Sequence, residues 1–214
     1  MENIAAGNLR KTQDRWGREA RSYSLELFKF FDDDFPQREQ LPRHFEVQIS
    51  ETIENGSVKM RAFIDGKQVG DPLTDNAYSS DGYRFHDVFH FGFAAGLAWS
   101  PVTRKNPGCK RKSNPQIEEV EDGGRATAIE EGLSAIIFDY AKKHRFLEGI
   151  SSLDYDLLKL IKSNSESLEV GRRTVADWER AILNSYDVWR EVTHSCGGTI
   201  VVDLEQRKLS YRVS

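Results

Sequence analysis

Residues 81–100, with the sequence DGYRFHDVFHFGFAAGLAWS, constrain the fold more than any other stretch of this chain. No charged side chain occurs in residues 91–99, so a helix here is apolar on every side. We therefore predict that it lies in the middle of a domain. The helical repeat places His86 and His90 one turn apart on one face, beside Asp87. Burying such ionisable groups is costly unless they are paired or bind a metal.

Length, charge and cysteine content narrow the classes of protein that this chain can represent. Its 214 residues suffice for one large domain or two small ones, and since no linker is visible we predict one domain over 1–214. The net charge of −4 gives no case for binding nucleic acid or an anionic membrane. No apolar run reaches the roughly 20 residues that a membrane span needs, and no signal peptide is visible. With only two cysteines, a reduced cytoplasmic protein without membrane association is expected.

Two regions alternate in hydrophobicity as strands do, and the rest has helical periodicity. Phe45, Val47 and Ile49 alternate with polar residues, and a returning strand follows a turn at Asn55-Gly56. We predict an α+β fold with a helical core and one small antiparallel sheet from residues 44–70 and 199–213. Pro101 is predicted to close the central helix, and residues 70–76 and 102–117 to form connections. The other predicted helices cover residues 11–33, 125–144, 153–161 and 174–194.

The histidine pair has two interpretations. Neutral imidazoles at positions i and i+4 can share a metal ion, with Asp87 or a distant carboxylate completing the ligands. Alternatively, His86 and His90 are core histidines whose ring nitrogens bind backbone carbonyls or Asp87. Because Arg84 and Asp87 crowd the same turn, the pattern favours neither.

The second strong helix brings further carboxylates. Glu130 and Glu131 open its apolar half, and because neighbours on a helix lie about 100° apart, at most one of them points squarely at the centre. Glu121 and Asp122, one Gly-Gly turn upstream, could join them as oxygen ligands for Mg²⁺. Alternatively, the acidic stretch is solvated and the two glutamates pair with Arg125 or with the basic connection. That connection carries Lys110, Arg111 and Lys112, which either meet phosphate oxygens or form a solvated loop.

These motifs resemble those of MazG-type nucleotide pyrophosphohydrolases, and more narrowly the C-terminal region found in some of them. The resemblance covers residues 44–145 well. It rests on GDPLTDN at 70–76, DGYRFHDVFH at 81–90, WSPV at 99–102, KRKS at 110–113, EEVED at 118–122 and IEE at 129–131. It implies a helical, Mg²⁺-dependent and usually oligomeric enzyme that cleaves nucleoside triphosphates to monophosphate and pyrophosphate.

One departure leaves two functions open. The family signature is ExxE followed by ExxD, and Glu118-x-x-Glu121 matches the first half, but Ser134 stands where the aspartate after Glu131 should be. The favoured hypothesis is a divalent-metal-dependent phosphohydrolase acting on a nucleotide or related phosphoanhydride, with Mg²⁺ or Mn²⁺ and a homo-oligomeric state. The alternative is a non-catalytic nucleotide-binding or oligomerisation module of a stress or defence pathway. The candidate residues are Asp87, Glu130 and Glu131 for catalysis; His86, Asp87, His90, Glu121, Asp122, Glu130 and Glu131 for metal; and Arg84, Lys110, Arg111 and Lys112 for substrate.

Overall fold

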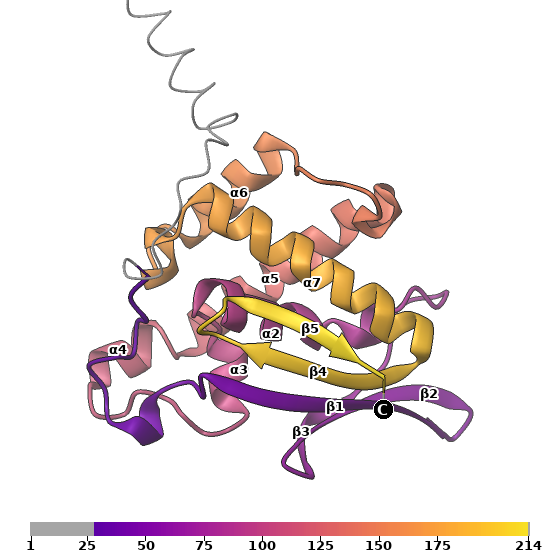
Figure 1. The fold of residues 1–214 in the computed structure, drawn as a ribbon, viewed down its shortest axis with the longest axis horizontal. Helices are drawn as coiled ribbons and strands as arrows, with labels where there is room; N and C mark the ends of the chain where they lie inside the picture. Colours follow the sequence, from indigo (N-terminus) through magenta and orange to yellow (C-terminus); the bar gives the residue numbers. More distant parts are fainter. Residues whose placement is uncertain (1–27, 214) are drawn as a thin grey trace, which may run out of the picture. The chain divides into compact units, whose positions relative to one another are not determined.

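The two alternating regions form one antiparallel sheet in the computed structural model, which describes residues 28–213. β1 (His44–Glu54), β2 (Ser57–Ile64) and β3 (Lys67–Leu73) make a meander, and β4 (Gly197–Asp203) and β5 (Lys208–Arg212) make a hairpin. The strand order is β3-β2-β1-β4-β5, because residues 44–50 of β1 pair with residues 197–203 of β4 (Figure 1). The predicted α+β class and the single sheet are confirmed.

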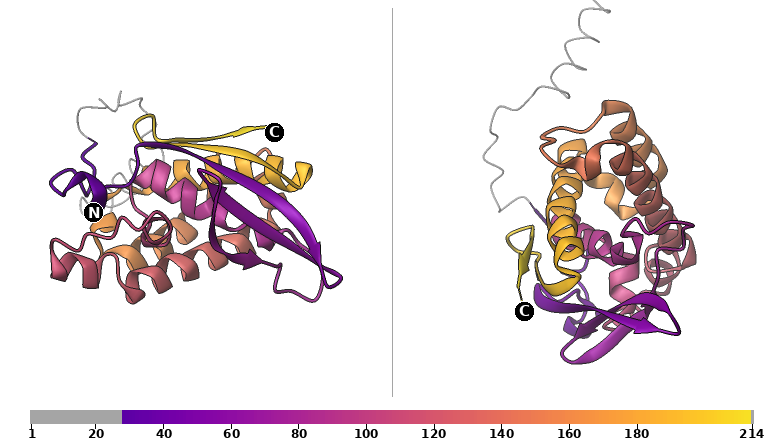
Figure 2. Two further views of the ribbon diagram at one scale, coloured as in Figure 1. Left: turned by 90° about the horizontal axis from the view of Figure 1, so that it is seen from below. Right: turned by 90° about the vertical axis from the view of Figure 1, so that its right-hand side faces the viewer.

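The helix predicted to be central is α2 (Asp87–Leu97), preceded by the short η3 (Tyr83–Phe85). Every residue of α2 after Asp87 is buried. It packs against α7 (Val175–Ser195) and against β4 and β5 of the sheet, as the views of Figures 1 and 2 agree. Its own side chains explain this position, since no face of the helix is suited to water.

Glycine allows α2 and α7 to approach closely. A Cβ atom added to Gly96 would lie 2.7 Å from the Cβ of Ala181, and one added to Gly92 would lie 1.8 Å from the hydroxyl oxygen of Ser185. Both separations are shorter than any ordinary contact, so neither position accepts a larger residue without moving a helix. The backbones of α2 and α7 are therefore nearly in contact.

α5 (Gly124–Lys143) lies on the other side of α2 from α7, which the end-on view of Figure 2 shows. α6 (Tyr155–Ser165) packs between α5 and α7. Shorter helices fill the connections: η2 (Gln37–Glu39), α3 (Pro101–Lys105), α4 (Pro115–Val120), η4 (Arg145–Leu147) and η5 (Glu169–Arg172). The helices predicted at 125–144, 153–161 and 174–194 are thus confirmed, with ends shifted by a few residues.

Three local predictions are wrong. Residues 28–33 are coil and turn instead of the end of a helix, and the rest of the predicted 11–33 helix lies outside the described residues. Pro101 begins α3 instead of closing α2, because proline suits the first turn of a helix and Ser100 caps it. β3 runs through Pro72 to Leu73, which is possible because β3 is an edge strand.

The chain divides into two compact units, which bears on the prediction of one domain over residues 1–214. Residues from Phe31 onward form one unit, and Phe28–Phe30 group with the preceding residues. One domain over 1–214 therefore stays a prediction. None of the helices in the described part of the chain combines the length and the hydropathy that crossing a membrane requires.

Candidate metal centre

The two predicted histidines are held in the same way: each Nδ1 is bound to an acceptor, and each Nε2 is directed into one cluster. The Nδ1 of His86 lies 2.9 Å from the carbonyl oxygen of Tyr83, and the Nδ1 of His90 lies 2.8 Å from a carboxylate oxygen of Glu130. Both partners are acceptors, so each Nδ1 carries the proton and donates it. A neutral imidazole held in this way presents its Nε2 lone pair, and this is how metal-binding histidines are usually fixed.

Two carboxylates lie beside these nitrogens. The Nε2 of His86 is 3.9 Å from an oxygen of Asp87 and 3.9 Å from an oxygen of Glu131. The Nε2 of His90 is 3.3 Å from the same Glu131 oxygen, but it is not aligned for a hydrogen bond with any described residue. Among residues 28–213, His86, Asp87 and His90 are the group whose ligand atoms all lie within 4.8 Å of one another.

The cluster is closed at its base and open at one side. The side chain of His90 is 1% exposed, that of Asp87 is 17% exposed and that of Glu131 is 43% exposed. Tyr83 stacks on the ring of His86, with centroids 4.5 Å apart. Solvent and any ligand therefore reach the cluster from the side of Asp87 and Glu131.

Glu130 lies behind His90 and does not face the open side. It is fully buried, and besides the His90 ring it accepts hydrogen bonds from the hydroxyl of Ser100 at 2.6 Å and from the amide of Val102 at 2.9 Å. Its carboxylate is therefore saturated by the start of α3 and by α2. The structure makes Glu130 the residue that orients His90, whereas the sequence placed it among the metal ligands and catalytic groups. As expected for neighbours on a helix, it and Glu131 reach His90 from different sides.

The charged groups of the cluster shift one another's pKa values. Burial lowers the pKa of His90, but the carboxylates of Glu130 and Glu131 outweigh burial and raise that pKa to about 10. Burial raises the pKa of Asp87, partly offset by the two histidines. The nearby ring of His90 lowers the pKa of Glu131, and burial offsets part of this effect. At neutral pH His90 is therefore protonated in the metal-free protein, and a metal ion bound to Nε2 would replace that proton beside the same excess of carboxylate over imidazole.

The donor atoms suit a transition-metal ion. Ligands about 2.1 Å from an ion lie about 3.4 Å apart in a tetrahedron and about 3 to 4.2 Å apart in an octahedron. The observed separations of 3.3 and 3.9 Å fall in this range. Two imidazoles beside carboxylates suit Mn²⁺ or a similar ion better than Mg²⁺, which prefers oxygen ligands.

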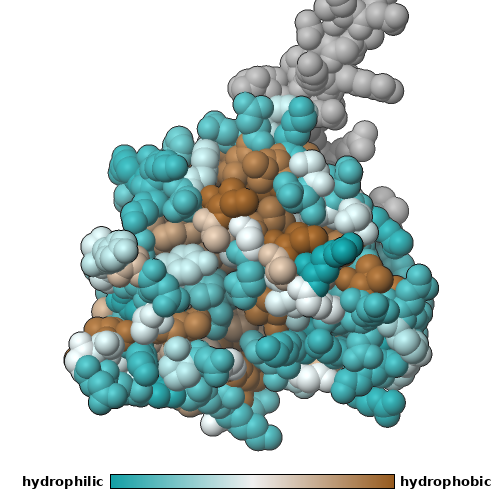
Figure 3. Space-filling view, turned by 180° about the vertical axis from the view of Figure 1, so that it is seen from behind, coloured by the Kyte–Doolittle hydropathy of each residue, from teal (hydrophilic) through white to brown (hydrophobic). Residues whose placement is uncertain are grey.

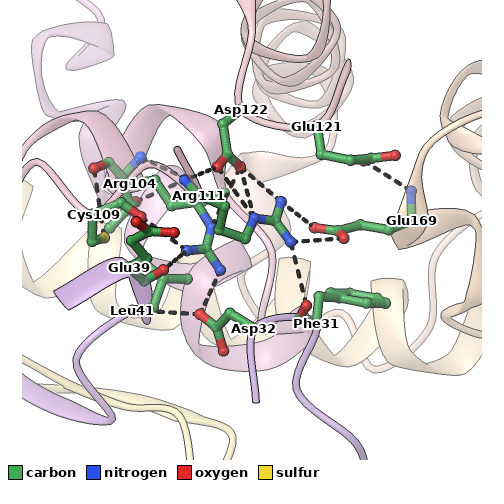
Figure 4. A network of polar contacts seen from close by, with 12 residues as sticks. Phe31, Asp32, Glu39, Leu41, Arg104, Cys109, Arg111, Glu121, Asp122 and Glu169 are labelled. Carbon is green, nitrogen blue, oxygen red and sulfur yellow. Dashed lines mark hydrogen bonds and ion pairs between the residues drawn. The ribbon is translucent and has the colours of Figure 1, made fainter. Parts of the chain in front are cut away.

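The predicted ligands Glu121 and Asp122 lie in a different network, shown in Figure 4. Asp122 receives the backbone amide of Arg111 at 2.7 Å and its guanidinium at 2.7 and 3.2 Å. The same guanidinium binds both carboxylate oxygens of Glu169, at 2.7 and 2.8 Å, and the amide of Glu169 donates to Glu121. The structure therefore does not bring Glu121, Asp122 or the predicted substrate residue Arg111 to the histidine cluster.

Arg104 extends this network to the start of the described chain. It is 2% exposed and bonds to Asp32, to the carbonyl of Glu39 at 2.9 Å and to the carbonyl of Cys109 at 3.2 Å. Asp32 also accepts the amide of Leu41 at 2.8 Å (Figure 4). Every charge in the network has a partner, so its contacts fix the connection between α2 and α5.

The other predicted substrate residues have separate surroundings. Arg84 pairs with Glu51 at 2.6 Å and with Asp75 at 2.8 Å, which ties η3 to β1 and to the loop after β3. Lys112 is exposed and Lys110 half-buried. In the described part of the chain neither lysine side chain forms a hydrogen bond or salt bridge, and nothing in their contacts links them to the cluster.

Sequence reasoning missed the groups that orient the histidines. No sequence motif marks these groups, which are the Tyr83 carbonyl, the Ser100 hydroxyl and the Val102 amide. Two of the three belong to the backbone. Ser134, one turn after Glu130 on α5, is fully buried, and its hydroxyl forms no hydrogen bond with the described residues. The Ser100-Pro101 pair is typical of a helix start, so it could have predicted that Ser100 caps a helix.

The protein is therefore an α+β domain with a candidate metal site, which two oriented histidines and two carboxylates form on α2 and α5. A family model described as the MazG C-terminal domain matches residues 26–214, so the chain belongs to that family. This confirms the resemblance found in the sequence. No curated protein and no solved structure matches the chain.

Proposed function

We propose that this domain is a divalent-metal-dependent phosphohydrolase acting on a nucleotide or a related phosphoanhydride, with Mn²⁺ as its metal. One observation carries the proposal: both histidines have Nδ1 fixed by an acceptor and Nε2 directed toward Asp87 and Glu131. Membership of a MazG-related family supports the nucleotide as substrate. A bound divalent ion would supply Lewis-acid activation of a phosphate oxygen and of an attacking water.

The residues then divide into three roles. His86, His90 and Asp87 hold the ion, and Glu130 keeps the ring of His90 in place. Glu131 is the most exposed member, so it is best placed to take a proton from water. In the cleavage that the resemblance implies, the water oxygen bonds to the α-phosphorus, the bond from that phosphorus to the bridging oxygen breaks, and pyrophosphate leaves.

The alternative, a nucleotide-binding module without turnover, is favoured by a specific observation. Arg84 and Arg111, two of the cations expected to meet phosphate, are bound to carboxylates elsewhere. Serine also stands at position 134, where the hydrolase signature has aspartate. Binding of nucleotide with no release of phosphate or pyrophosphate would select this alternative.

The test measures metal content and turnover in the same variants. Elemental analysis of the purified protein and a nucleotide screen with phosphate and pyrophosphate detection should give a stoichiometric transition metal and turnover. His90→Ala should lose both while the fold survives. His194→Ala, which removes an exposed histidine on α7, should lose neither. Wild-type metal content in His90→Ala would contradict the proposed centre.

A further inference from the structure

The connection between α5 and α6 contains a left-handed turn. The three residues of η4, Arg145, Phe146 and Leu147, have positive φ angles of 56°, 50° and 59°. This region of backbone conformation is costly for residues with a side chain, and it is rarely adopted by more than one residue in a row. Such strain persists only where the surrounding structure holds it, and it often occurs at functional sites. The contacts of this turn therefore show what the strain supports.

Contacts from α5 and α7 hold the turn. The guanidinium of Arg190 on α7 donates a hydrogen bond to the carbonyl oxygen of Phe146 at 2.7 Å. The ring centroid of Phe146 lies 4.7 Å from that of Trp189 on α7 and 5.7 Å from that of Phe138 on α5. A right-handed turn would direct this side chain elsewhere, so the left-handed turn is what places the ring of Phe146 against both helices.

From Phe146 a row of aromatic rings leads to the candidate metal centre. Phe138 meets the ring of Tyr83 edge to face, with centroids 4.9 Å apart. Tyr83 in turn stacks on the ring of His86, and its carbonyl oxygen accepts the Nδ1 proton of His86. Edge-to-face and stacked rings at such distances attract each other. The row therefore joins the left-handed turn to one of the two histidines.

Trp189 holds the same segment from a second side. Its Nε1–H donates to the carbonyl oxygen of Gly82 at 3.3 Å, and a Cβ atom added to Gly82 would lie 2.9 Å from the Trp189 ring. Gly82 precedes η3 with a φ of 83°, which glycine adopts without strain. The ring of Phe146 therefore reaches η3 by two routes, through Trp189 and through Phe138.

The row belongs to the core of the molecule. Phe138 and Trp189 are buried. Figure 3 shows the side that lies behind Figure 1, where apolar residues reach the surface and hydrophilic ones border them. The large exposed apolar side chains of α5 and α6 are Ile136 and Leu160, and neither belongs to the row. The aromatic row therefore acts inside the protein and not as a docking surface.

The two histidines are fixed by different means. His90 is held by the carboxylate of Glu130. The Nδ1 of His86 bonds instead to a backbone oxygen of η3, and the ring of Tyr83 covers one face of the imidazole. The orientation of His86 therefore depends on where η3 and the Tyr83 ring lie.

We propose that Phe146 is a positioning residue of the candidate metal centre. Its ring, held by the left-handed turn, keeps Tyr83 stacked on His86 and so keeps the Nε2 of His86 directed into the cluster. This inference rests on the proposed function, because it concerns the site at which the metal would bind. Loss of the Phe146 ring should loosen His86 and leave His90 in place.

Nuclear magnetic resonance of the metal-free protein tests the position of His86 directly. The ring protons of His86 lie against the Tyr83 ring, so its ring current should shift their signals upfield. Phe146→Leu keeps an apolar side chain but should lose most of that shift. Phe93→Leu is the matched control, because Phe93 is buried farther along α2, where its ring packs against Trp178. It should leave the His86 signals unchanged.

Titration of the same proteins with Mn²⁺ gives the second readout. Groups that orient a metal ligand typically contribute 10- to 100-fold to metal affinity, so Phe146→Leu should raise the dissociation constant at least about tenfold. Phe93 is the more buried of the two phenylalanines, so Phe93→Leu should lose at least as much stability while binding Mn²⁺ like the wild type. A purely structural role of Phe146 would not separate the two variants in this way.

Arg145→Gly tests the turn itself. Arg145 is exposed, and glycine adopts its φ of 56° without strain. This variant should therefore melt no lower than the wild type and keep the His86 signals. A lower melting temperature would show that the turn is not left-handed and would overturn the proposal.

The outcomes distinguish this proposal from the proposed function. Unchanged His86 signals in Phe146→Leu would overturn the positioning role, whatever the metal affinity. Equal losses of Mn²⁺ affinity in Phe146→Leu and Phe93→Leu would overturn it as well. A wild type that binds no metal would contradict the proposed function, while the His86 signals would still decide whether the aromatic row holds this histidine.

Discussion

Replacing Glu130 by glutamine tests whether this residue orients the candidate metal centre from behind. The wild-type carboxylate accepts hydrogen bonds from His90, Ser100 and Val102 at 2.6 to 2.9 Å. Glutamine has the same shape, but one of its two oxygens becomes an NH₂ donor. Whichever way round the amide lies, that donor faces either the Val102 amide or the His90 and Ser100 groups.

The cost follows from these contacts. Leaving a buried donor unpaired costs about 1–3 kcal/mol, and bonds to a charged acceptor are stronger than bonds to a neutral one. We therefore expect Glu130→Gln to lower the free energy of unfolding by about 3 kcal/mol. For a chain of this size the midpoint of thermal unfolding should fall by about 6–12 °C. Metal affinity should fall too, because an amide NH₂ facing Nδ1 of His90 moves the ring proton to Nε2 and blocks its lone pair.

The matched variant is Glu131→Gln, the same change at the next residue. Its side chain is 43% exposed and does not hold α3, so stability should change by less than about 0.5 kcal/mol while metal affinity falls. Urea unfolding and titration with Mn²⁺ measure the two quantities. Equal stability losses in the two variants would refute the distinction between the buried glutamate that orients His90 and the exposed glutamate at the open side of the cluster.

Two further predictions concern parts of the fold away from the cluster. Gly96→Leu should lower stability by about 1–3 kcal/mol, because even a Cβ atom there lies 2.7 Å from that of Ala181; an unchanged urea midpoint would show that α7 does not hold α2. Burial raises the pKa of Asp32, but Arg43 and Arg104 outweigh burial and hold that pKa below its usual value. The carboxylate therefore stabilises the fold above about pH 4, and this contribution is lost as pH falls through the lowered pKa. The stability gap between the wild type and Asp32→Asn should narrow in acid, and a gap independent of pH would contradict this role.

The parts of the fold that follow from local pattern could be predicted from the sequence. The alternation at Phe45, Val47 and Ile49 predicts β1, and the apolar run after His90 predicts a buried helix, because burial in these elements depends on residues close in the chain. The i, i+4 spacing also places His86 and His90 together. The prediction that Pro101 closes the central helix is wrong because proline can follow the end of one helix and also suits the first turn of the next.

What could not be predicted depends on residues far apart in the chain. In the sequence Arg111 is one of several cations in a basic loop, but in the structure it pairs with Glu169. Local sequence patterns do not relate residues so far apart in the chain. The roles of Glu130 and Glu131 depend on which of them meets the start of α3, and one helix alone does not decide this. Buried ion pairs form only when the tertiary structure brings both partners together, so composition and spacing do not distinguish them from a solvated surface.

The pairing of β1 with β4 has a consequence for how the protein is made. Residues 44–50 leave the ribosome early, but their partners are residues 197–203. α2 likewise waits for α7 and β4 to cover its apolar surface. A nascent chain therefore carries a bare strand edge and an uncovered apolar helix through most of its synthesis, which is a state that chaperones bind and that aggregates when crowded. Slow translation between these two segments would lengthen that exposure.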